Sequence, residues 1–160
     1  MIDELYSAHI LKLAANMPHC GRLAEAQGTG ERVAKLCGSR AIVDVTLDET
    51  GRIADFAQDV KACALGQAAA GVVGESIIGA YPDEIEQARD ALAAMLKAGG
   101  DGPEGRFESL RALKQVAAYP ARHASTMVAI EATLDAVRQA QGPASARKSP
   151  DTRTSLAGVA

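Results

Sequence analysis

Two cysteines, Cys37 and Cys63, are the residues of this sequence whose type and spacing could do chemistry. Thiolates are nucleophiles and soft metal ligands, so a thiol pair points to sulfur chemistry or metal binding. Between them, residues 41–47 alternate apolar and polar side chains, residues 48–51 carry turn chemistry, and a second apolar run reaches Val60. This pattern predicts an antiparallel β-hairpin.

The hairpin predicts that the two thiols lie close together. Facing residues of an antiparallel ladder have a constant index sum, and a turn centred between Glu49 and Thr50 sets that sum near 99 or 100. Extending the ladder outward places Cys37 opposite Ala62 or Cys63. We therefore expect the thiols to meet at the open end of the hairpin.

Cys63 also lies at a predicted helix N-terminus, because apolar residues recur at helical spacing from Leu65 to Ile77. Unpaired backbone N–H groups and the helix dipole favour an anion there, which suits a reactive thiolate. The alternative is that Cys63 is a small buried apolar residue. The glycines and alanines of 66–74 favour close helix packing, with a flat docking face as the other interpretation.

Composition excludes some function classes. The 160 residues include 17 basic and 20 acidic side chains, a net charge of -3, and only two Phe, three Tyr and no Trp. Neither a basic phosphate-binding surface nor a base-stacking platform is indicated, so we expect no nucleic-acid partner. No charged-then-apolar leader opens the chain and no apolar run approaches a membrane span. We expect a cytoplasmic protein with reduced thiols and no membrane partner.

The remaining patterns predict five further elements around the hairpin. A helix is expected over 2–16, a third strand over 31–36, and three helices after residue 80. The apolar positions expected to be buried in those three helices are Ile85, Ala88, Leu92 and Met95; Phe107, Leu110, Leu113 and Ala117; and Met127, Ile130, Leu134 and Val137. We predict an α+β domain over 1–140, a small antiparallel sheet of about three strands with helices on one face, and a disordered tail over 141–160.

One family resembles this arrangement. Cys37 followed by Gly38 at a strand end, and residues 61–63 opening a helix rich in small residues, resemble the U-type iron-sulfur cluster assembly scaffolds, the NifU N-terminal, IscU and SufU family. The resemblance covers about residues 2–140, and the segment 99–122 is similar to an insertion of the SufU branch. In that family the site consists of a Cys-Gly-Asp motif, a second Cys before a helix, and a third Cys opening the last helix.

The resemblance carries over position by position. The first Cys falls on Cys37, the Asp position on Ser39, the second Cys on Cys63 and the third Cys position on Ser125. Two of the four ligand positions are therefore substituted. Serine hydroxyls keep their proton at neutral pH, so Ser39 and Ser125 offer weak coordination at best.

Two more residues enter through the resemblance. Arg122 matches a basic residue of the SufU-like pattern. His123 stands one residue before the position of a His in the IscU branch, and it is a third candidate metal ligand if the last helix begins one residue later. The alternative is a polar residue or cap partner at a helix start.

The resemblance implies a protein that is not an enzyme. As a scaffold or sulfur acceptor, it would receive sulfur from a cysteine desulfurase, or bind iron, zinc or a transient iron-sulfur cluster through Cys37 and Cys63, and supply recipient apo iron-sulfur proteins. The alternative is a degenerate member that binds no cluster and acts as an interaction or regulatory module for the desulfurase. A weaker third interpretation is a reversible disulfide between the two cysteines. The role of Cys20 is left open.

Overall fold

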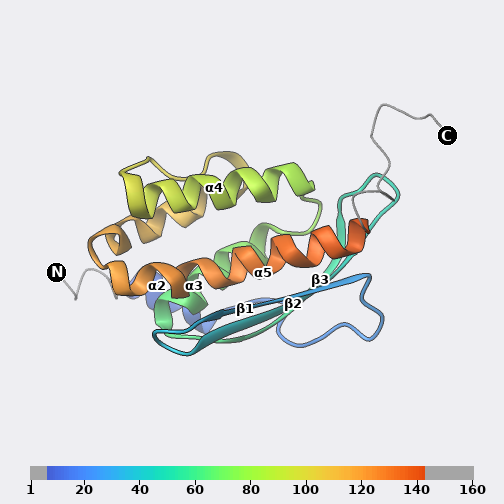
Figure 1. Cartoon of the computed structure of the whole chain (residues 1–160), viewed down its shortest axis with the longest axis horizontal. Coiled ribbons are helices and arrows are strands. Elements are labelled where there is room, and N and C mark those ends of the chain that lie inside the picture. The colour runs from blue at the N-terminus through green and yellow to red at the C-terminus, as the bar shows by residue number, and fades with distance from the viewer. Residues whose placement is uncertain (1–6, 143–160) are drawn as a thin grey trace.

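The structure, a computed structural model, describes residues 7–142. Three antiparallel strands, β1 (Gly28–Ala34), β2 (Ser39–Leu47) and β3 (Ile53–Lys61), form one sheet in that order. The helical elements are α2 (Ala8–Ala15), α3 (Ala64–Ser76), α4 (Pro82–Ala98), η1 (Gly105–Ala118), η2 (Pro120–Arg122) and α5 (His123–Gln141). Helices α3 and α5 pack on the sheet, and α4 and η1 lie over them as a further layer (Figure 1). The predicted α+β fold is confirmed.

The hairpin of β2 and β3 exists, but its register differs from the prediction. The pair Leu47 and Ile53 has the index sum 100, whereas the pairs from Thr46 and Asp55 onward have the sum 101, because the register shifts there. The extra residue, Ala54, makes the difference, and such irregularities are not visible in an alternating pattern. Gly51 adopts a φ of +89° in the turn, as its turn role predicts.

The first strand begins earlier than expected, at Gly28 rather than residue 31. A Cβ atom on Gly28 would overlap the carbonyl oxygen of Ala136, and one on Gly30 would overlap that of Ala132. Glycines are typical of loops, but here the absence of a side chain lets the backbone of α5 lie against β1.

Glycines of α3 serve the same purpose. A Cβ on Gly66 would come 2.8 Å from the carbonyl oxygen of Ser125, and one on Gly71 would come 2.6 Å from that of Leu13. All the glycines and alanines of α3 except Ala64 are buried. The close-packing interpretation of this segment is therefore confirmed. The contact at Gly66 also brings the first turns of α3 and α5 together.

The other helices follow their predicted patterns with one difference. All the apolar positions expected to be buried in α4 and α5 are buried. In η1 the buried set ends with Val116 rather than Ala117, and the preceding members are Phe107, Leu110 and Leu113. This spacing of three is that of a 3₁₀ helix, in which residues three apart lie directly above one another.

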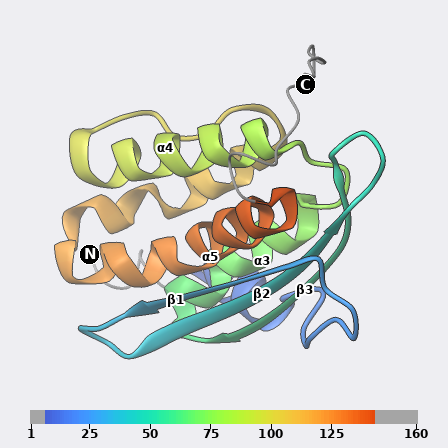
Figure 2. The same cartoon turned by 45° about the vertical axis from the view of Figure 1, so that its right-hand side comes forward.

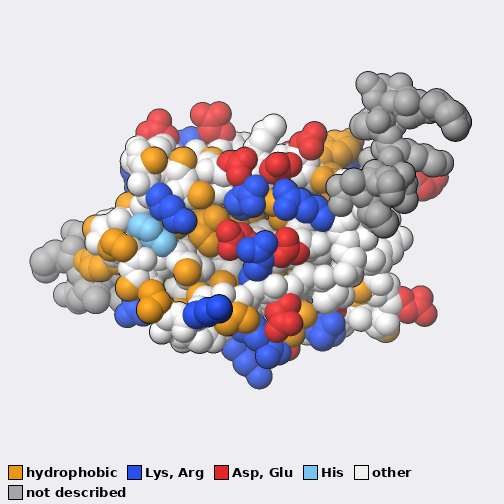
Figure 3. Space-filling model, viewed as in Figure 1, with side chains coloured by type: hydrophobic (Ala, Val, Ile, Leu, Met, Phe, Trp, Pro, Cys, Tyr) orange, Lys and Arg blue, Asp and Glu red, His pale blue; other side chains and the backbone are white. Residues whose placement is uncertain are grey.

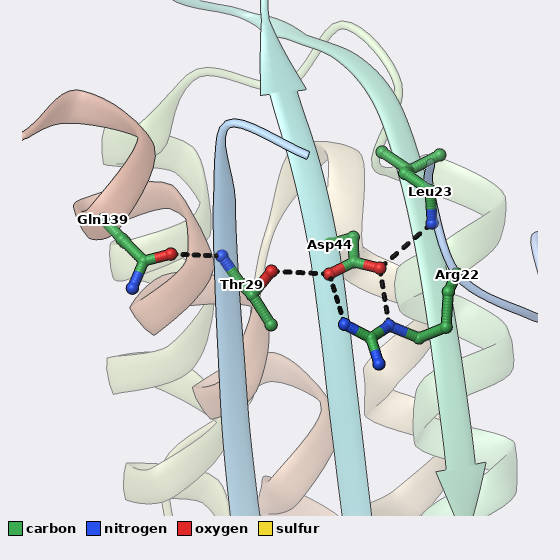
Figure 4. A network of polar contacts seen from close by, with 5 residues as sticks. All are labelled: Arg22, Leu23, Thr29, Asp44 and Gln139. Atoms are coloured by element: carbon green, nitrogen blue, oxygen red, sulfur yellow. Dashed lines mark hydrogen bonds and ion pairs between the residues drawn. The ribbon is translucent and has the colours of Figure 1, made fainter. Parts of the chain in front are cut away.

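A buried carboxylate ties the segment before β1 to the sheet (Figure 4). Asp44 is fully buried, and it accepts hydrogen bonds from Arg22 Nε at 2.7 Å, Thr29 Oγ1 at 2.6 Å and Leu23 N at 3.0 Å. Burial alone would raise the pKa of Asp44, but the bonds from Arg22 and Thr29 outweigh it, so the pKa is lowered. The alternating pattern of β2 predicted a polar residue here but not its burial.

Charges on the face of the molecule shown in Figure 3 are mixed in sign. Arg32 of β1 pairs with Asp135 of α5, and Arg138 of α5 pairs with Glu86 of α4 at 3.8 Å.

None of the helices within residues 7–142 is both long and apolar enough to cross a membrane. Gln141, which was predicted to belong to the tail, belongs to α5. Residues 1–6 of the predicted first helix and residues 143–160 of the predicted tail lie outside the described residues.

Candidate thiol site

Cys37 lies in the turn that joins β1 and β2. The turn is closed by the bond from Gly38 N to Ala34 O at 2.8 Å, and Gly38 has a φ of +75°, which favours glycine. The ladder of β2 with β3 ends at Arg40 and Lys61, so the expectation that Cys37 lies on that ladder opposite Ala62 or Cys63 is wrong. The thiol is exposed at the tip of a turn instead.

The sulfur of Cys37 has a buried hydroxyl beside it. Cys37 Sγ lies 3.0 Å from Ser39 Oγ, and Ser39 is only 2% exposed. The pKa of the Cys37 thiol is lowered, above all by the hydroxyl of Ser39, and further by the Ser39 N–H, the Ser125 hydroxyl and the charge of Arg122; partial burial acts in the opposite direction. This environment favours the thiolate, the nucleophilic form.

Cys63 caps the N-terminus of α3, as the change of periodicity predicts. Its backbone is extended and its side chain makes no capping bond to the helix. The thiol is half-buried, and its sulfur lies 3.5 Å from Ser125 Oγ. Cys63 is therefore directed at the start of α5 rather than at its own helix.

Ser125 contacts one cysteine and affects the pKa of the other. It is fully buried in the first turn of α5, donates a hydrogen bond to Arg122 O at 3.1 Å, contacts Cys63 and lowers the pKa of Cys37. The β1–β2 turn and the starts of α3 and α5 lie at the same end of the molecule (Figure 2). The structure thus brings together Cys37, Ser39, Cys63 and Ser125, although by a route other than the predicted ladder.

His123 is the one candidate ligand that the structure directs elsewhere. It begins α5, and its Nε2 lies 3.0 Å from Val116 O and 3.2 Å from Ala117 O. The ring therefore holds the end of η1 against the start of α5. The helix does not begin later than His123, so the condition for the ligand role is not met.

The donors at this site do not fit a resident zinc ion. Structural zinc takes four donors from Cys, His and carboxylate side chains, and catalytic zinc takes three. This site offers two thiols and two neutral hydroxyls. Across residues 7–142, no three His, Cys, Asp or Glu side chains are grouped so as to hold a metal.

Arg122 is the residue whose importance the sequence understated. It entered only as a match to a basic position, yet its positive charge acts on the Cys37 thiol. It lies in η2, directly before α5, and it is half-buried. Its place beside the turn of Cys37 depends on how η2 and α5 pack on the sheet, and no local pattern contains that information.

Comparisons with known proteins agree on one family. The family model of the NifU-like N terminal domain matches residues 5–126. The crystal structure of a nitrogen-fixing NifU-like protein, N-terminal, from Brucella abortus is 44% identical, with a TM-score of 0.86 over 89% of this chain and 99% of that one. Among curated proteins no sequence matches significantly.

Two more distant structures share the fold. A proposed iron-sulfur cluster assembly scaffold protein for the SUF system from Fervidobacterium islandicum AW-1 is 21% identical, with a TM-score of 0.76 over 84% of this chain and 98% of that one. A hypothetical protein is 22% identical, with a TM-score of 0.71 over 85% and 98%. The family match and the close structural relative both cover the thiol site, and the chain therefore belongs to the NifU-like N-terminal domain family.

Proposed function

We propose that this protein works in iron-sulfur cluster assembly as a sulfur acceptor that also holds a transient cluster as cargo. The family to which the chain belongs consists of scaffold proteins and not of enzymes. The observation that carries the proposal is that each thiol lies beside a buried hydroxyl at the same end of the molecule: Cys37 Sγ is 3.0 Å from Ser39 Oγ, and Cys63 Sγ is 3.5 Å from Ser125 Oγ. The partners are a cysteine desulfurase as sulfur source and apo iron-sulfur proteins as recipients.

The exposed thiol is the better first acceptor. Cys37 lies at the tip of a turn, where the persulfide of another protein can reach it, whereas Cys63 is half-buried. Neighbouring groups favour its thiolate form, and the thiolate is the species that attacks a sulfane sulfur. A reducing compartment, such as the cytoplasm predicted from the sequence, would keep both thiols available for this step.

The thiol pair also suits a loosely held cluster. Iron-sulfur clusters are held by about four thiolates, and this site supplies two. Cys37 and Cys63 would hold iron and sulfide only until a recipient with a full ligand set removes them. Zinc is not part of the proposal, because the donor set does not fit it.

The test uses the full chain with a cysteine desulfurase, cysteine and ferrous iron under anaerobic conditions. We expect desulfurase-dependent sulfur on Cys37, found by mass spectrometry after alkylation, and a visible iron-sulfur absorption band. Cys37→Ser and Cys63→Ser should each abolish the band. Cys20→Ser is the matched control, because Cys20 is exposed and its sulfur contacts Met17 O at 3.1 Å. An unchanged band in Cys37→Ser with Cys63→Ser would refute the proposal.

The second candidate is a module that regulates the desulfurase without carrying sulfur. It is favoured by the replacement of two ligand positions by Ser39 and Ser125. In that case the double cysteine variant should still bind the desulfurase and change its turnover as much as the wild type does. Loss of the effect in the double variant would exclude this function.

A further inference from the structure

We infer that the hydroxyls of Ser39 and Ser125 bind the terminal, anionic sulfur of a persulfide on Cys37. The site can then carry sulfur without a resident metal. The inference rests on the proposed sulfur-acceptor function. The inference assigns a function to Ser39 and Ser125, the two positions at which the family pattern has metal ligands. The ligand class is a sulfane-sulfur anion, and the residues that recognise it are hydrogen-bond donors.

The placement of Ser39 is the first support. Its side chain is 98% buried in β2, and within the described residues its hydroxyl makes no hydrogen bond except the one to Cys37 Sγ at 3.0 Å. Buried polar groups are nearly always paired by hydrogen bonds, and in the part of the chain that the structure describes the only partner of this buried hydroxyl is the Cys37 sulfur. The Ser39 hydroxyl is thus available to bond the Cys37 sulfur and no other group within residues 7–142.

Ser125 provides a second hydroxyl on the other side of the site. At rest it donates to Arg122 O at 3.1 Å and contacts Cys63 Sγ at 3.5 Å. A hydroxyl has one hydrogen and rotates to suit its partners, and a charged acceptor forms a stronger bond than a neutral carbonyl. An anionic sulfur arriving near Ser125 would therefore compete for that hydrogen.

The charge around the site favours an anion over a divalent cation. Arg122 supplies a positive charge that acts on Cys37. Helix α3 begins after Cys63, whose side chain makes no capping bond, so the first N–H groups and the positive end of the helix dipole lie at this edge. A metal ion would need anionic donors in place of the two serines, whereas an anion needs the donors that are present.

The transfer step balances without an outside oxidant. The Cys37 thiolate attacks the outer sulfur of the donor persulfide, a new S–S bond forms at Cys37, and the S–S bond of the donor breaks. The donor leaves as a thiolate and takes up the proton that Cys37 released. The transferred sulfur keeps its oxidation level, and its negative end lies among the hydroxyls of Ser39 and Ser125.

The experiment measures persulfide lifetime on the full chain after metal removal by a chelator. Inorganic polysulfide is the probe, Cys20→Ser is the common background, and alkylation followed by mass spectrometry counts the sulfur atoms on Cys37 over time. A hydrogen bond to a charged group accounts for about a tenfold effect, so Ser39→Ala should shorten the lifetime about tenfold and Ser125→Ala by several-fold. Ser39→Thr keeps the hydroxyl, so its persulfide lifetime should be close to that of the wild type.

Two controls separate this role from a structural one. Ser109→Ala removes an exposed hydroxyl of η1 and should leave the lifetime unchanged. Ser39→Asp combined with Ser125→Cys restores the donors of the family pattern, so its zinc affinity against a chelator should rise by orders of magnitude while the persulfide lifetime falls. Opposite shifts of the two readouts cannot come from misfolding.

The outcomes are distinct. Equal persulfide lifetimes in the wild type, Ser39→Ala and Ser125→Ala overturn the inference, as does sulfur loading that requires added zinc. If the wild type takes sulfur from polysulfide and shows the predicted serine dependence, but takes none from a desulfurase with cysteine, the inference stands and the proposed sulfur source is wrong. If the wild type takes sulfur from neither source, the proposed function itself fails.

Discussion

Cys37 owes its chemistry to neighbours that come from two distant parts of the chain. Ser39 begins β2, Ser125 lies in the first turn of α5, and Arg122 lies in η2. All three stabilise negative charge on the sulfur, and partial burial of the thiol opposes them. The balance lowers the pKa of Cys37, so a larger fraction is thiolate at neutral pH than for an ordinary cysteine.

We predict that Ser39→Ala raises the pKa of Cys37 towards that of an ordinary thiol. Because alkylation requires the thiolate, the rate for Cys37 at neutral pH should fall, and the midpoint of its pH profile should move upward. The measurement is the iodoacetamide rate at Cys37 against pH, with Cys20 in the same sample as the internal reference. A midpoint that stays in place would show that the hydroxyl does not act on the thiol.

Helix α5 lies closer to the sheet than ordinary side chains allow. Gly28 and Gly30 of β1 face the carbonyl oxygens of Ala136 and Ala132, and Gly66 of α3 faces that of Ser125. Packing at this distance places the first turn of α5 against the thiol site. The small residues of these elements are thus what allows Ser125 to lie beside Cys63.

We predict that Gly30→Ala destabilises the protein by about 1 to 3 kcal/mol, because the added Cβ overlaps backbone that cannot move without shifting α5. Gly100→Ala is the matched control: its Cβ would lie 3.3 Å from its nearest neighbours, in a loop, so a smaller loss is expected. Urea unfolding of both variants measures the difference. Equal midpoints would mean that α5 is not held against β1 as closely as described.

The molecule as a unit depends on a polar network around Asp44, which joins distant parts of the chain. Asp44 in the middle strand binds Arg22 and Leu23, and it also accepts the hydroxyl hydrogen of Thr29. The next bond in the chain runs from Thr29 N to Gln139 Oε1 at 2.8 Å, near the end of α5 (Figure 4). The network joins the segment before β1, the sheet and the last helix.

We predict a pH dependence of stability from this carboxylate. Since the folded pKa of Asp44 is lowered, its stabilising contribution is present above the unfolded pKa of about 3.9 and is lost as the pH falls through the folded value. Asp44→Asn should lower stability by about 1 to 3 kcal/mol near neutral pH, with a smaller loss of stability on acidification. Thermal unfolding at several pH values tests this. Parallel pH curves for wild type and variant would contradict it.

The sequence by itself determined the thiol pair, the hairpin, the helix that begins after Cys63 and the family resemblance. Each depends on periodicity, turn residues or spacing, which are local and readable. It also predicted that Ser39 and Ser125 occupy the positions beside the thiols, and the structure places their hydroxyls there.

Tertiary structure alone decided how those groups meet. Cys37 lies in a turn and not on the ladder because β1 ends at Ala34 and pairs there with Ser39, the first residue of β2. The shift at Ala54 also changes the register of β2 with β3, and strand register depends on packing against other elements. His123 turned to the carbonyls of Val116 and Ala117, since η1 ends within its reach. Arg122 gained its role, and Asp44 its burial, from segments distant in the chain. Such contacts are set by non-local packing, which no pattern within a single element encodes.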